Sequence, residues 1–346
     1  MSPPSKGMRT FGKILLIGVL GLAVLICVGV TIKFGPSPFL GPKVRPLTDR
    51  KFESTPARLE RGRYIFTSLS ACARCHTPMD LSQRGYPPTP DMMGAGQVLP
   101  QGLLPGRIVA PNLTSDVETG AGSWTDDQLA RAIREGIGHD GRTLFPIMPY
   151  QNFREMSDED LASVIVFLRS LPAIHHELPK TEIKFPISRF INALPKPITE
   201  PVSAPDSSDP VVWGKHLVRM AGCPSCHTPT SLDNKPLPGM DFAGGMPVSF
   251  KGVTIVSGNL TPDASGIAYY DEATFMKALR TGYVGARPLG SAMPFVIYGN
   301  LTDDDMKAMF AYLRTIQPVH HRVDNSLPPT YCKLCRHKHG AGDQNR

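Results

Sequence analysis

Charged side chains are scarce in this chain of 346 residues, at 19% of the total, and regular alternation of polar and apolar residues is not evident. The low share of charged residues argues against long solvated helices and against a disordered chain. Without regular alternation, the sequence gives no sign of extended strands. Glycine and proline are plentiful instead, at 32 and 35 residues. We therefore expect compact domains with many ordered loops, whose cores a large prosthetic group could help to fill.

A single strongly basic patch is also missing, although the formal net charge is +7. The basic residues that do cluster lie near the two ends of the chain: Lys6, Arg9 and Lys13, then Lys333, Arg336 and Lys338. Nucleic-acid binding needs positive charge gathered on one face. The sequence therefore predicts no nucleic-acid partner.

Two copies of Cys-x-x-Cys-His stand out: Cys72-Ala73-Arg74-Cys75-His76 and Cys223-Pro224-Ser225-Cys226-His227. This pattern is the attachment signature of c-type haem. The two thiols add to the porphyrin vinyl groups, and the adjacent histidine can ligate the iron from one face. The alternative for each cysteine pair is a disulfide or half of another metal site. Two copies favour haem, so we expect two covalently attached haem c groups.

Residues 14–32 form the one long apolar run, nineteen uncharged residues flanked by Lys13 and Lys33. As a helix they would span roughly 28 Å, close to the thickness of a bilayer core. Because cations precede the run, the positive-inside rule places residues 1–13 in the cytoplasm and the remainder across the membrane. We expect a single-pass protein of a bacterial inner membrane with its cysteines in the periplasm.

A cleaved signal peptide is the alternative to an anchor, but its apolar region would be shorter and would end at small residues. No good Ala-x-Ala site follows this run. A lipoprotein site at Cys27 is disfavoured by the bulky Ile26 before it. The sequence favours a retained anchor.

The chain contains an internal repeat around the two motifs. The repeated features keep the same order, and they pair as Gly62 with Gly214, Asn112-Leu113-Thr114 with Asn259-Leu260-Thr261, Arg134-x-Gly136 with Arg280-x-Gly282, and Met148-Pro149-Tyr150 with Met293-Pro294-Phe295. We expect one domain over residues 54–172 and a second over residues 208–318, here called the first and second units. A Pro-rich linker, residues 173–207, joins them, and residues 319–346 look like a tail.

Each unit reads as a few helices joined by long loops. Thr125 and Gln128 predict a capping box at the start of one helix. Ser157 and Thr302 predict the starts of the last helix of the two units. The fold expected from the sequence is all-α.

These motifs resemble the cytochrome c superfamily and, more narrowly, the membrane-associated multihaem cytochromes c of periplasmic alcohol, aldehyde and gluconate dehydrogenases. The resemblance rests on Cys-x-x-Cys-His-Thr-Pro, Asn-Leu-Thr, Arg-x-Gly and Met-Pro-Tyr/Phe in one order, and it covers both units. It implies two tandem all-α cytochrome c domains with His76 and His227 as proximal ligands. Those subunits usually have three haem motifs and a different anchor, whereas this chain has two complete motifs.

Met148 and Met293 are the candidates for the sixth iron ligand. The chain has 14 methionines, and most methionines in proteins fill cores. Only these two occupy equivalent positions, each before a proline and an aromatic ring. A thioether ligand would favour reduced iron and raise its potential. Arg134 and Arg280 could pair with haem propionates, or they could be solvated arginines on helix faces.

The tail holds Cys332-Lys333-Leu334-Cys335-Arg336-His337, in which Arg336 stands where a ligand histidine would be. A third haem is therefore not expected. A local disulfide is the plain interpretation, and a metal site with His337 and His339 is the alternative. The pairs His175-His176 and His320-His321 follow the two units and are expected to be exposed.

The sequence thus predicts an electron carrier rather than an enzyme. It would take electrons from a quinol-oxidising complex or a periplasmic dehydrogenase and pass them to a terminal oxidase or a soluble cytochrome. The alternative is a dihaem enzyme such as a peroxidase, which needs one iron with a displaceable ligand.

Overall fold

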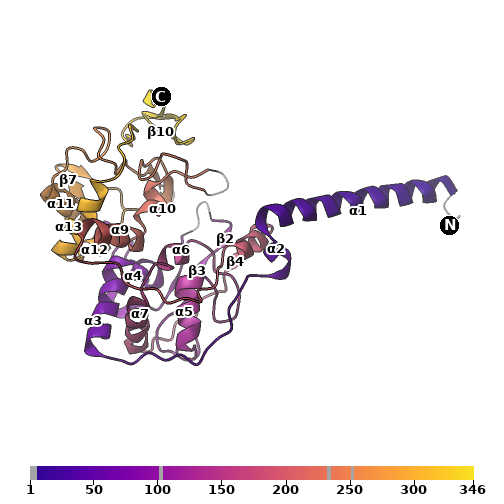
Figure 1. The fold of residues 1–346 in the computed structure, drawn as a ribbon, viewed down its shortest axis with the longest axis horizontal. Helices are drawn as coiled ribbons and strands as arrows, with labels where there is room; N and C mark the ends of the chain where they lie inside the picture. Colours follow the sequence, from indigo (N-terminus) through magenta and orange to yellow (C-terminus); the bar gives the residue numbers. More distant parts are fainter. Residues whose placement is uncertain (1–5, 101–103, 232–234, 251–252) are drawn as a thin grey trace.

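The computed structural model describes residues 6–100, 104–231, 235–250 and 253–346, so residues 1–5 of the predicted cytoplasmic segment lie outside the described residues. A long helix projects from a head built of two stacked units (Figure 1). The first unit holds α3 (Pro56–Tyr64), α5 (Asp126–Glu135) and α7 (Asp158–Ser170), and the second holds α9 (Pro210–Met220), α11 (Glu272–Thr281) and α13 (Asp303–Leu313). The C-terminus lies on the second unit, at the end of the head away from α5 and α7.

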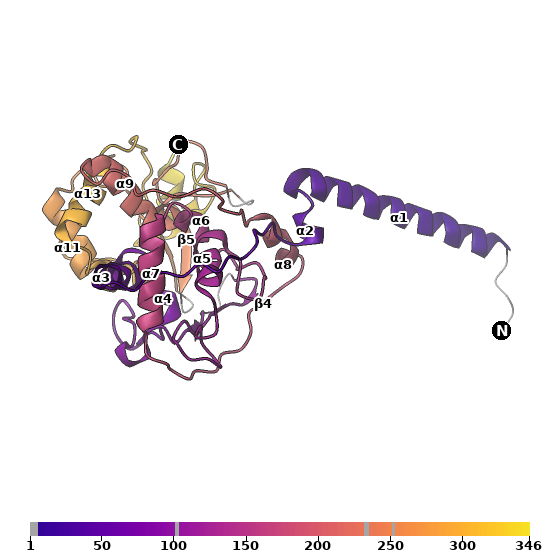
Figure 2. The same cartoon turned by 60° about the horizontal axis from the view of Figure 1, so that its bottom comes forward.

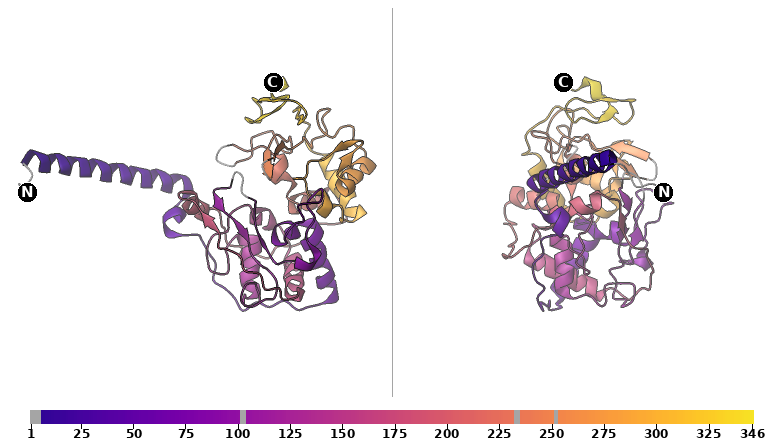
Figure 3. Two further views of the ribbon diagram at one scale, coloured as in Figure 1. Left: turned by 180° about the vertical axis from the view of Figure 1, so that it is seen from behind. Right: turned by 90° about the vertical axis from the view of Figure 1, so that its right-hand side faces the viewer.

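The projecting helix α1 spans Lys6–Phe34. Its apolar segment Phe11–Phe34 contains an 18-residue window with a mean hydropathy of 2.9, and none of that window is buried by the rest of the chain. Figure 2 and the left panel of Figure 3 show it leaving the head at α2 (Ser37–Leu40) and α8 (Ile187–Phe190). The chain therefore has one N-terminal apolar helix long enough to cross a bilayer.

The first unit is held together by short and medium helices. They are α3 (Pro56–Tyr64), the π-helical turn η1 (Ile65–Leu69), α4 (Cys72–His76), η2 (Pro90–Met92), α5 (Asp126–Glu135), α6 (Tyr150–Phe153) and α7 (Asp158–Ser170). The predicted capping box is confirmed, because Thr125 accepts from the Gln128 amide while the Gln128 side chain accepts from Thr125. Ser157 caps α7 as predicted.

The second unit repeats this order. Its helices are α9 (Pro210–Met220), α10 (Cys223–His227), α11 (Glu272–Thr281), α12 (Phe295–Tyr298) and α13 (Asp303–Leu313). Asp209, Asp271 and Thr302 cap α9, α11 and α13 through their side chains. The repeat read from the sequence is therefore a repeat of structure.

Short strand pairs, which the sequence analysis did not anticipate, brace the loops. All are antiparallel: β1 (Gln97–Val98) with β3 (Val109–Ala110), β2 (Gly106–Arg107) with β4 (Glu182–Ile183), β5 (Pro247–Phe250) with β6 (Val253–Val256), β7 (Tyr283–Val284) with β8 (Arg287–Pro288), and β9 (Pro329–Tyr331) with β10 (Lys338–Gly340). Single turns of 3-10 helix, η3 (Ile191–Ala193) and η4 (Gly342–Gln344), complete the elements. Helices supply most of the main core, and the rest comes from loops rather than from these strands.

One glycine in each unit lets the first and last helices touch through their backbones. A Cβ at Gly62 would lie 1.9 Å from the carbonyl oxygen of Ser163 in α7. A Cβ at Gly214 would lie 1.9 Å from the carbonyl oxygen of Ala308 in α13. Any side chain at these positions would push the helices apart. The paired glycines of the repeat thus mark the two helix crossings.

The spacing from this glycine to the first motif cysteine differs between the units, ten residues from Gly62 and nine from Gly214. The π-helical turn η1 lies in the longer copy, between Gly62 and Cys72. A π-turn takes up one extra residue within a helix. The insertion is therefore absorbed before the motif, which keeps its position relative to the core.

The two units share one hydrophobic core. A single cluster of buried residues runs from Ile65 and Phe66 in the first unit to Met306 and Leu313 in the second. The left panel of Figure 3 shows the helices of the first unit lying below those of the second. The head therefore behaves as one packed body.

Candidate haem sites

Both Cys-x-x-Cys-His motifs form one helical turn, α4 and α10. The residue before each helix has a left-handed backbone, with φ of 50° at Ala71 and 73° at Gly222. This conformation turns the chain sharply out of the preceding helix and into the motif. Cys72 and Cys223 both pack against the shared core. The attachment thiols of the two motifs thus occupy equivalent places.

The ring orientation of both motif histidines is set by a main-chain carbonyl. His76 Nδ1 donates to the carbonyl of Pro111 at 3.0 Å, and His227 Nδ1 donates to the carbonyl of Gly258 at 2.8 Å. Burial lowers the pKa of both imidazoles, so each ring stays neutral near neutral pH. In a neutral ring with a protonated Nδ1, Nε2 carries the free lone pair. Both histidines therefore fit the role of an iron ligand through Nε2, with the second nitrogen held by the backbone.

The Asn-Leu-Thr triplets hold these carbonyls in place. Asn112 directly follows Pro111, accepts from the backbone and hydroxyl of Thr114, and donates to the carbonyl of Ile174 at 2.8 Å. Asn259 directly follows Gly258, makes the same bonds to Thr261, and donates to the carbonyl of Val319 at 2.8 Å. Both asparagines are buried. The triplet thus holds the carbonyl that binds the motif histidine, a role that the sequence analysis did not assign to it.

Met148 and Met293 occupy the same local structure in their units. Each is partly buried against the shared core, and the aromatic ring two residues later is buried. Tyr150 packs on Gly136, where a Cβ would lie 2.6 Å from the ring, and Phe295 packs on Gly282 at 2.7 Å. Both glycines have a positive φ and end α5 and α11. The glycine of Arg-x-Gly and the aromatic ring of Met-Pro-aromatic therefore pack against each other. This contact fixes the loop that carries Met148 or Met293, here called the methionine loop.

Arg134 and Arg280 have protein partners. Arg134 is 4% exposed, donates to the carbonyl of Met156 and pairs with Asp158 at 2.7 Å. Arg280 donates to the carbonyl of Gly299 at 2.6 Å and pairs with Asp303. In both units the arginine thus ties the end of one helix to the start of the last helix. Contact with haem propionates stays a prediction.

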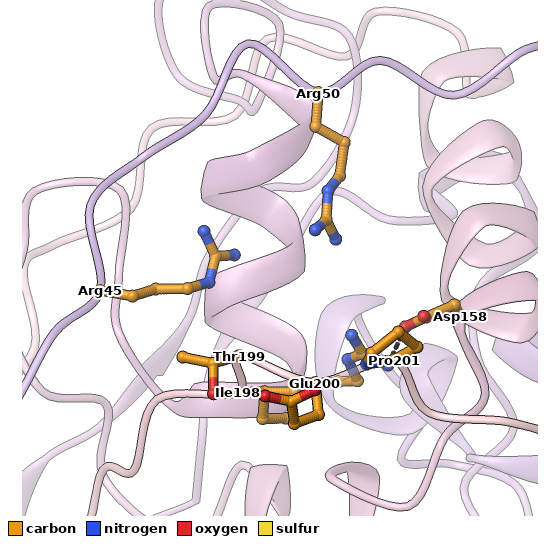
Figure 4. A pocket seen from close by; sticks show the side chains of 8 residues that line it. Arg45, Arg50, Asp158, Ile198, Thr199, Glu200 and Pro201 are labelled. Carbon is orange, nitrogen blue, oxygen red and sulfur yellow. Dashed lines mark ion pairs between the residues drawn. The ribbon is translucent and has the colours of Figure 1, made fainter.

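Figure 4 shows the small polar pocket that Arg134 lines, with the ion pair to Asp158 drawn as a dashed line. Arg45 and Arg50 enter it from the segment before α3, and Glu200 comes from the linker. Arg45 is already engaged by Asp127 and Glu135. The pocket, about 130 Å³, lies where the segment before α3 and the linker meet the first unit, and it involves neither motif.

The two motifs face each other across the interface of the units. Arg74, within the first motif, donates to the carbonyls of Ser291 and Ala292, immediately before Met293. In the opposite direction, Asn152, just after Tyr150, donates to Ser225 of the second motif at 3.1 Å. Each motif therefore contacts the methionine loop of the other unit.

Tyr298 lies between the motifs. Its hydroxyl donates to the carbonyl of Ala221, and burial raises its pKa well above the usual value. Cys75 of the first motif and Cys223 of the second both lie within electrostatic range of this phenol. Cysteines of both motifs thus lie near the same buried side chain, that of Tyr298.

The expectation that both histidine pairs are exposed is wrong for the second member of each. His176 is half-buried and its Nδ1 donates to the carbonyl of Ala95 at 2.8 Å. His321 is fully buried and its Nδ1 donates to the carbonyl of Ala243 at 2.7 Å. Their equivalent place after each unit was the available signal for a shared structural role.

Comparison with known proteins agrees with these sites. The family model described as cytochrome c matches residues 59–172 and 211–317. The chain is 28% identical over 285 residues to a subunit of the nicotinate dehydrogenase of Pseudomonas putida, covering 75% of this chain and 21% of that protein. It is 26% identical over 282 residues to the cytochrome c subunit of the quinone alcohol dehydrogenase of Gluconobacter oxydans, covering 76% and 55%.

A third relative is closer in length. The diheme cytochrome c-type protein of Cereibacter sphaeroides is 26% identical over 281 residues, which cover 78% of this chain and 89% of that protein. The first two relatives are longer, and the chain spans about a fifth and about half of them. Two matched domains, each with a complete attachment motif and a correctly held histidine, account for two haem groups. The chain belongs to the cytochrome c family and is an electron-transfer protein with two covalently attached haem c groups.

Proposed function

We propose that this chain is a membrane-anchored relay that receives electrons from a periplasmic dehydrogenase or a quinol-oxidising complex and passes them to a terminal oxidase or soluble cytochrome. The observation that carries the proposal is the reciprocal contact at the unit interface. Arg74 reaches the loop before Met293, and Asn152 reaches Ser225. This arrangement supports a short path between two redox centres inside one rigid head.

We propose Met148 and Met293 as the sixth ligands. Haem iron in such a site exchanges one electron between ferrous and ferric states, and a thioether ligand raises its potential. The chain's part would be to hold the histidine and the methionine that bind each iron. The backbone carbonyls fix His76 and His227, and the Tyr150 and Phe295 rings fix the methionine loops. With both side chains bound to the iron, no open position would remain for a substrate.

The base of α1 supports a retained anchor. The ring of Phe34, the last residue of the helix, lies 5.0 Å from the ring of Phe190 in α8. Apolar side chains around this base are exposed, with Leu40 at 83% and Phe185 at 82%. Such side chains are suited to the bilayer interface. We propose that α1 crosses the bacterial inner membrane and that the α2–α8 region rests on its periplasmic face.

The relatives point to the donor. Their names identify part of a nicotinate dehydrogenase and the cytochrome c subunit of a quinone alcohol dehydrogenase. We propose a dehydrogenase of this general kind as a partner of the present chain. Which small molecule that partner oxidises lies outside this chain, since electrons arrive at the haem after substrate chemistry is complete.

Oxygen uptake by membrane vesicles tests the proposal. Vesicles from cells with and without the gene would be given alcohols, gluconate, nicotinate or a reduced quinone, one at a time. We expect uptake with at least one donor to fall several-fold without the gene and to return with the full-length chain. Unchanged uptake with every donor, together with peroxide consumption by the purified protein, would replace the relay with a dihaem peroxidase.

A further inference from the structure

The C-terminal segment gathers four metal-ligating side chains that neither haem uses. They are His321, which follows α13, Cys332 and Cys335 in the turn between β9 and β10, and His339 in β10. All four are at most 1% exposed, and one ligand atom from each lies within 4.8 Å of the others. We propose that these residues bind a single zinc ion.

The spacing suits one tetrahedral ion. Zinc bonds of about 2.3 Å to sulfur and about 2.0 Å to nitrogen imply ligand-to-ligand distances of roughly 3.3 to 3.8 Å. His321 Nε2 lies 3.3 Å from Cys332 Sγ. Two sulfurs and two nitrogens are a ligand set that selects zinc in closed structural sites.

Both histidines present the correct nitrogen. His321 Nδ1 donates to the carbonyl of Ala243 at 2.7 Å, and His339 Nδ1 donates to the carbonyl of Gly340 at 2.9 Å. Each ring therefore keeps the lone pair of Nε2 free for a metal ion. His339 Nε2 is buried and has no hydrogen-bond partner. A buried nitrogen without a partner is costly, and a metal ion at this point would satisfy it.

The competing interpretations of the cysteine pair explain fewer of these residues. In the structure Cys332 and Cys335 are free thiols, and a disulfide between them would leave both Nε2 atoms without a partner. Of the two histidines in the metal-site alternative, His339 lies in the cluster, whereas His321 takes the place expected for His337. A third haem has no room, since the two thiols are fully buried with Leu237, Met240 and Ala243.

The site fastens the C-terminal hairpin to the second unit. Ala243, which holds His321, is followed by Gly244, whose amide donates to the carbonyl of His227 at 2.7 Å. Asn345 accepts from the amide of Arg322 at 2.7 Å and closes the end of the chain onto the same region. The zinc site would thus brace the loop behind the second haem, whereas the equivalent His176 in the first unit has no cysteine pair.

Metal analysis of the full-length, haem-loaded protein tests the inference, with haem counted separately in the same sample. We expect about one zinc for every two haems. Cys332→Ser and His339→Ala should each lower the zinc content at least ten-fold while both haems remain. His320→Ala, next to the ligand, and His176→Ala, its counterpart in the first unit, are the matched controls and should keep the zinc.

Thiol labelling of the wild-type protein gives a readout that does not depend on variants folding. Peptide mass spectrometry should show Cys332 and Cys335 protected from alkylation until a chelator is added, and then both labelled. A Cys332–Cys335 disulfide, a third haem, iron beyond the two haem irons, or zinc retained in the ligand variants would each overturn the assignment.

Discussion

The two units of the head share one scaffold and differ in what surrounds it. Both use a glycine crossing, a histidine held by a carbonyl, and an aromatic ring on the glycine that ends a helix. The first unit is clamped by the segment before it, where Arg45 pairs with Asp127. The second is closed by the segment after it, through His321 and the C-terminal hairpin. The haem site is therefore the repeated part, and the outer supports differ.

Removing one attachment pair should have the largest effect. In the Cys72→Ala/Cys75→Ala double variant we expect one haem per chain instead of two, because the first group loses both thioether bonds. Cys223→Ala/Cys226→Ala should lose the other haem. Haem per chain, measured on denatured protein, checks this. If either double variant retained two covalent haems, the assignment of the motifs would be wrong.

Exchanging the proposed sixth ligand should have the second largest effect. Met148→His and Met293→His should each lower the potential of one haem by a substantial part of the about 0.8 V range that axial ligands span. Met156→Leu, a change at a buried core methionine, is the control and should leave both potentials nearly unchanged. The measurement is a spectroscopic redox titration. An unchanged potential in either histidine variant would remove that methionine from the iron.

Adding a methyl group at the helix crossings tests whether the two scaffolds are equally tight. Gly62→Ala and Gly214→Ala should each cost about 2 kcal/mol of stability or more, since the new Cβ meets a backbone oxygen at 1.9 Å. Glu60→Ala and Lys215→Ala, at exposed positions of α3 and α9, are matched controls. Denaturant unfolding gives the free energies. A tolerated alanine in one unit alone would show that its crossing is looser.

The clamp on the first unit should show the smallest effect and a clear pH dependence. Burial alone would raise the pKa of Asp127, but hydrogen bonds from Arg45 and from the Thr48 amide outweigh burial and lower it to about 2. The folded-state pKa lies below the ordinary value of 3.8, so the carboxylate stabilises the fold above that pH. This stability is lost as the pH falls from about 4 toward 2.

Asp127→Asn should therefore cost about 2 kcal/mol at pH 7 and progressively less below pH 4. The second unit has Ala273 at the equivalent position of α11, so this carboxylate contribution is missing there. Asp140→Asn, at an exposed ion pair, is the control. Unfolding curves between pH 3 and 7 provide the measurement. A cost that does not change with pH would assign the effect to packing instead of charge.

The features that the sequence predicted correctly are those with a short, recognisable sequence pattern. The motifs and the capping residues Thr125, Ser157 and Thr302 are each visible within a few residues, and the repeat follows from the shared order of such motifs; the structure has the caps where expected. The carbonyls of Pro111 and Gly258 could not be predicted this way, because every residue has a carbonyl and only the fold selects one. The short strand pairs could not be predicted for a similar reason. Strands of two to four residues are too short to show an alternation of polar and apolar side chains.

The burial of His321 was missed because its neighbours come from three separate segments. A pair of adjacent histidines after an amphipathic helix has no periodic signal that distinguishes a core position from an exposed one. Only the hairpin of β9 and β10, folded back on the loop around Ala243, encloses the ring. The near-copy of the haem motif at Cys332 identifies the two cysteines as candidate ligands. No sequence pattern links them to His321, eleven residues earlier.

A redox titration of the full-length protein with carbon monoxide added to the reduced form tests the central claim most directly. Two closed centres predict two haems per chain that titrate in one-electron steps, both at high potential and both unreactive toward carbon monoxide. A low-potential haem, or rapid carbon monoxide binding at either haem, would contradict the account of two equivalent, six-coordinate electron-transfer sites.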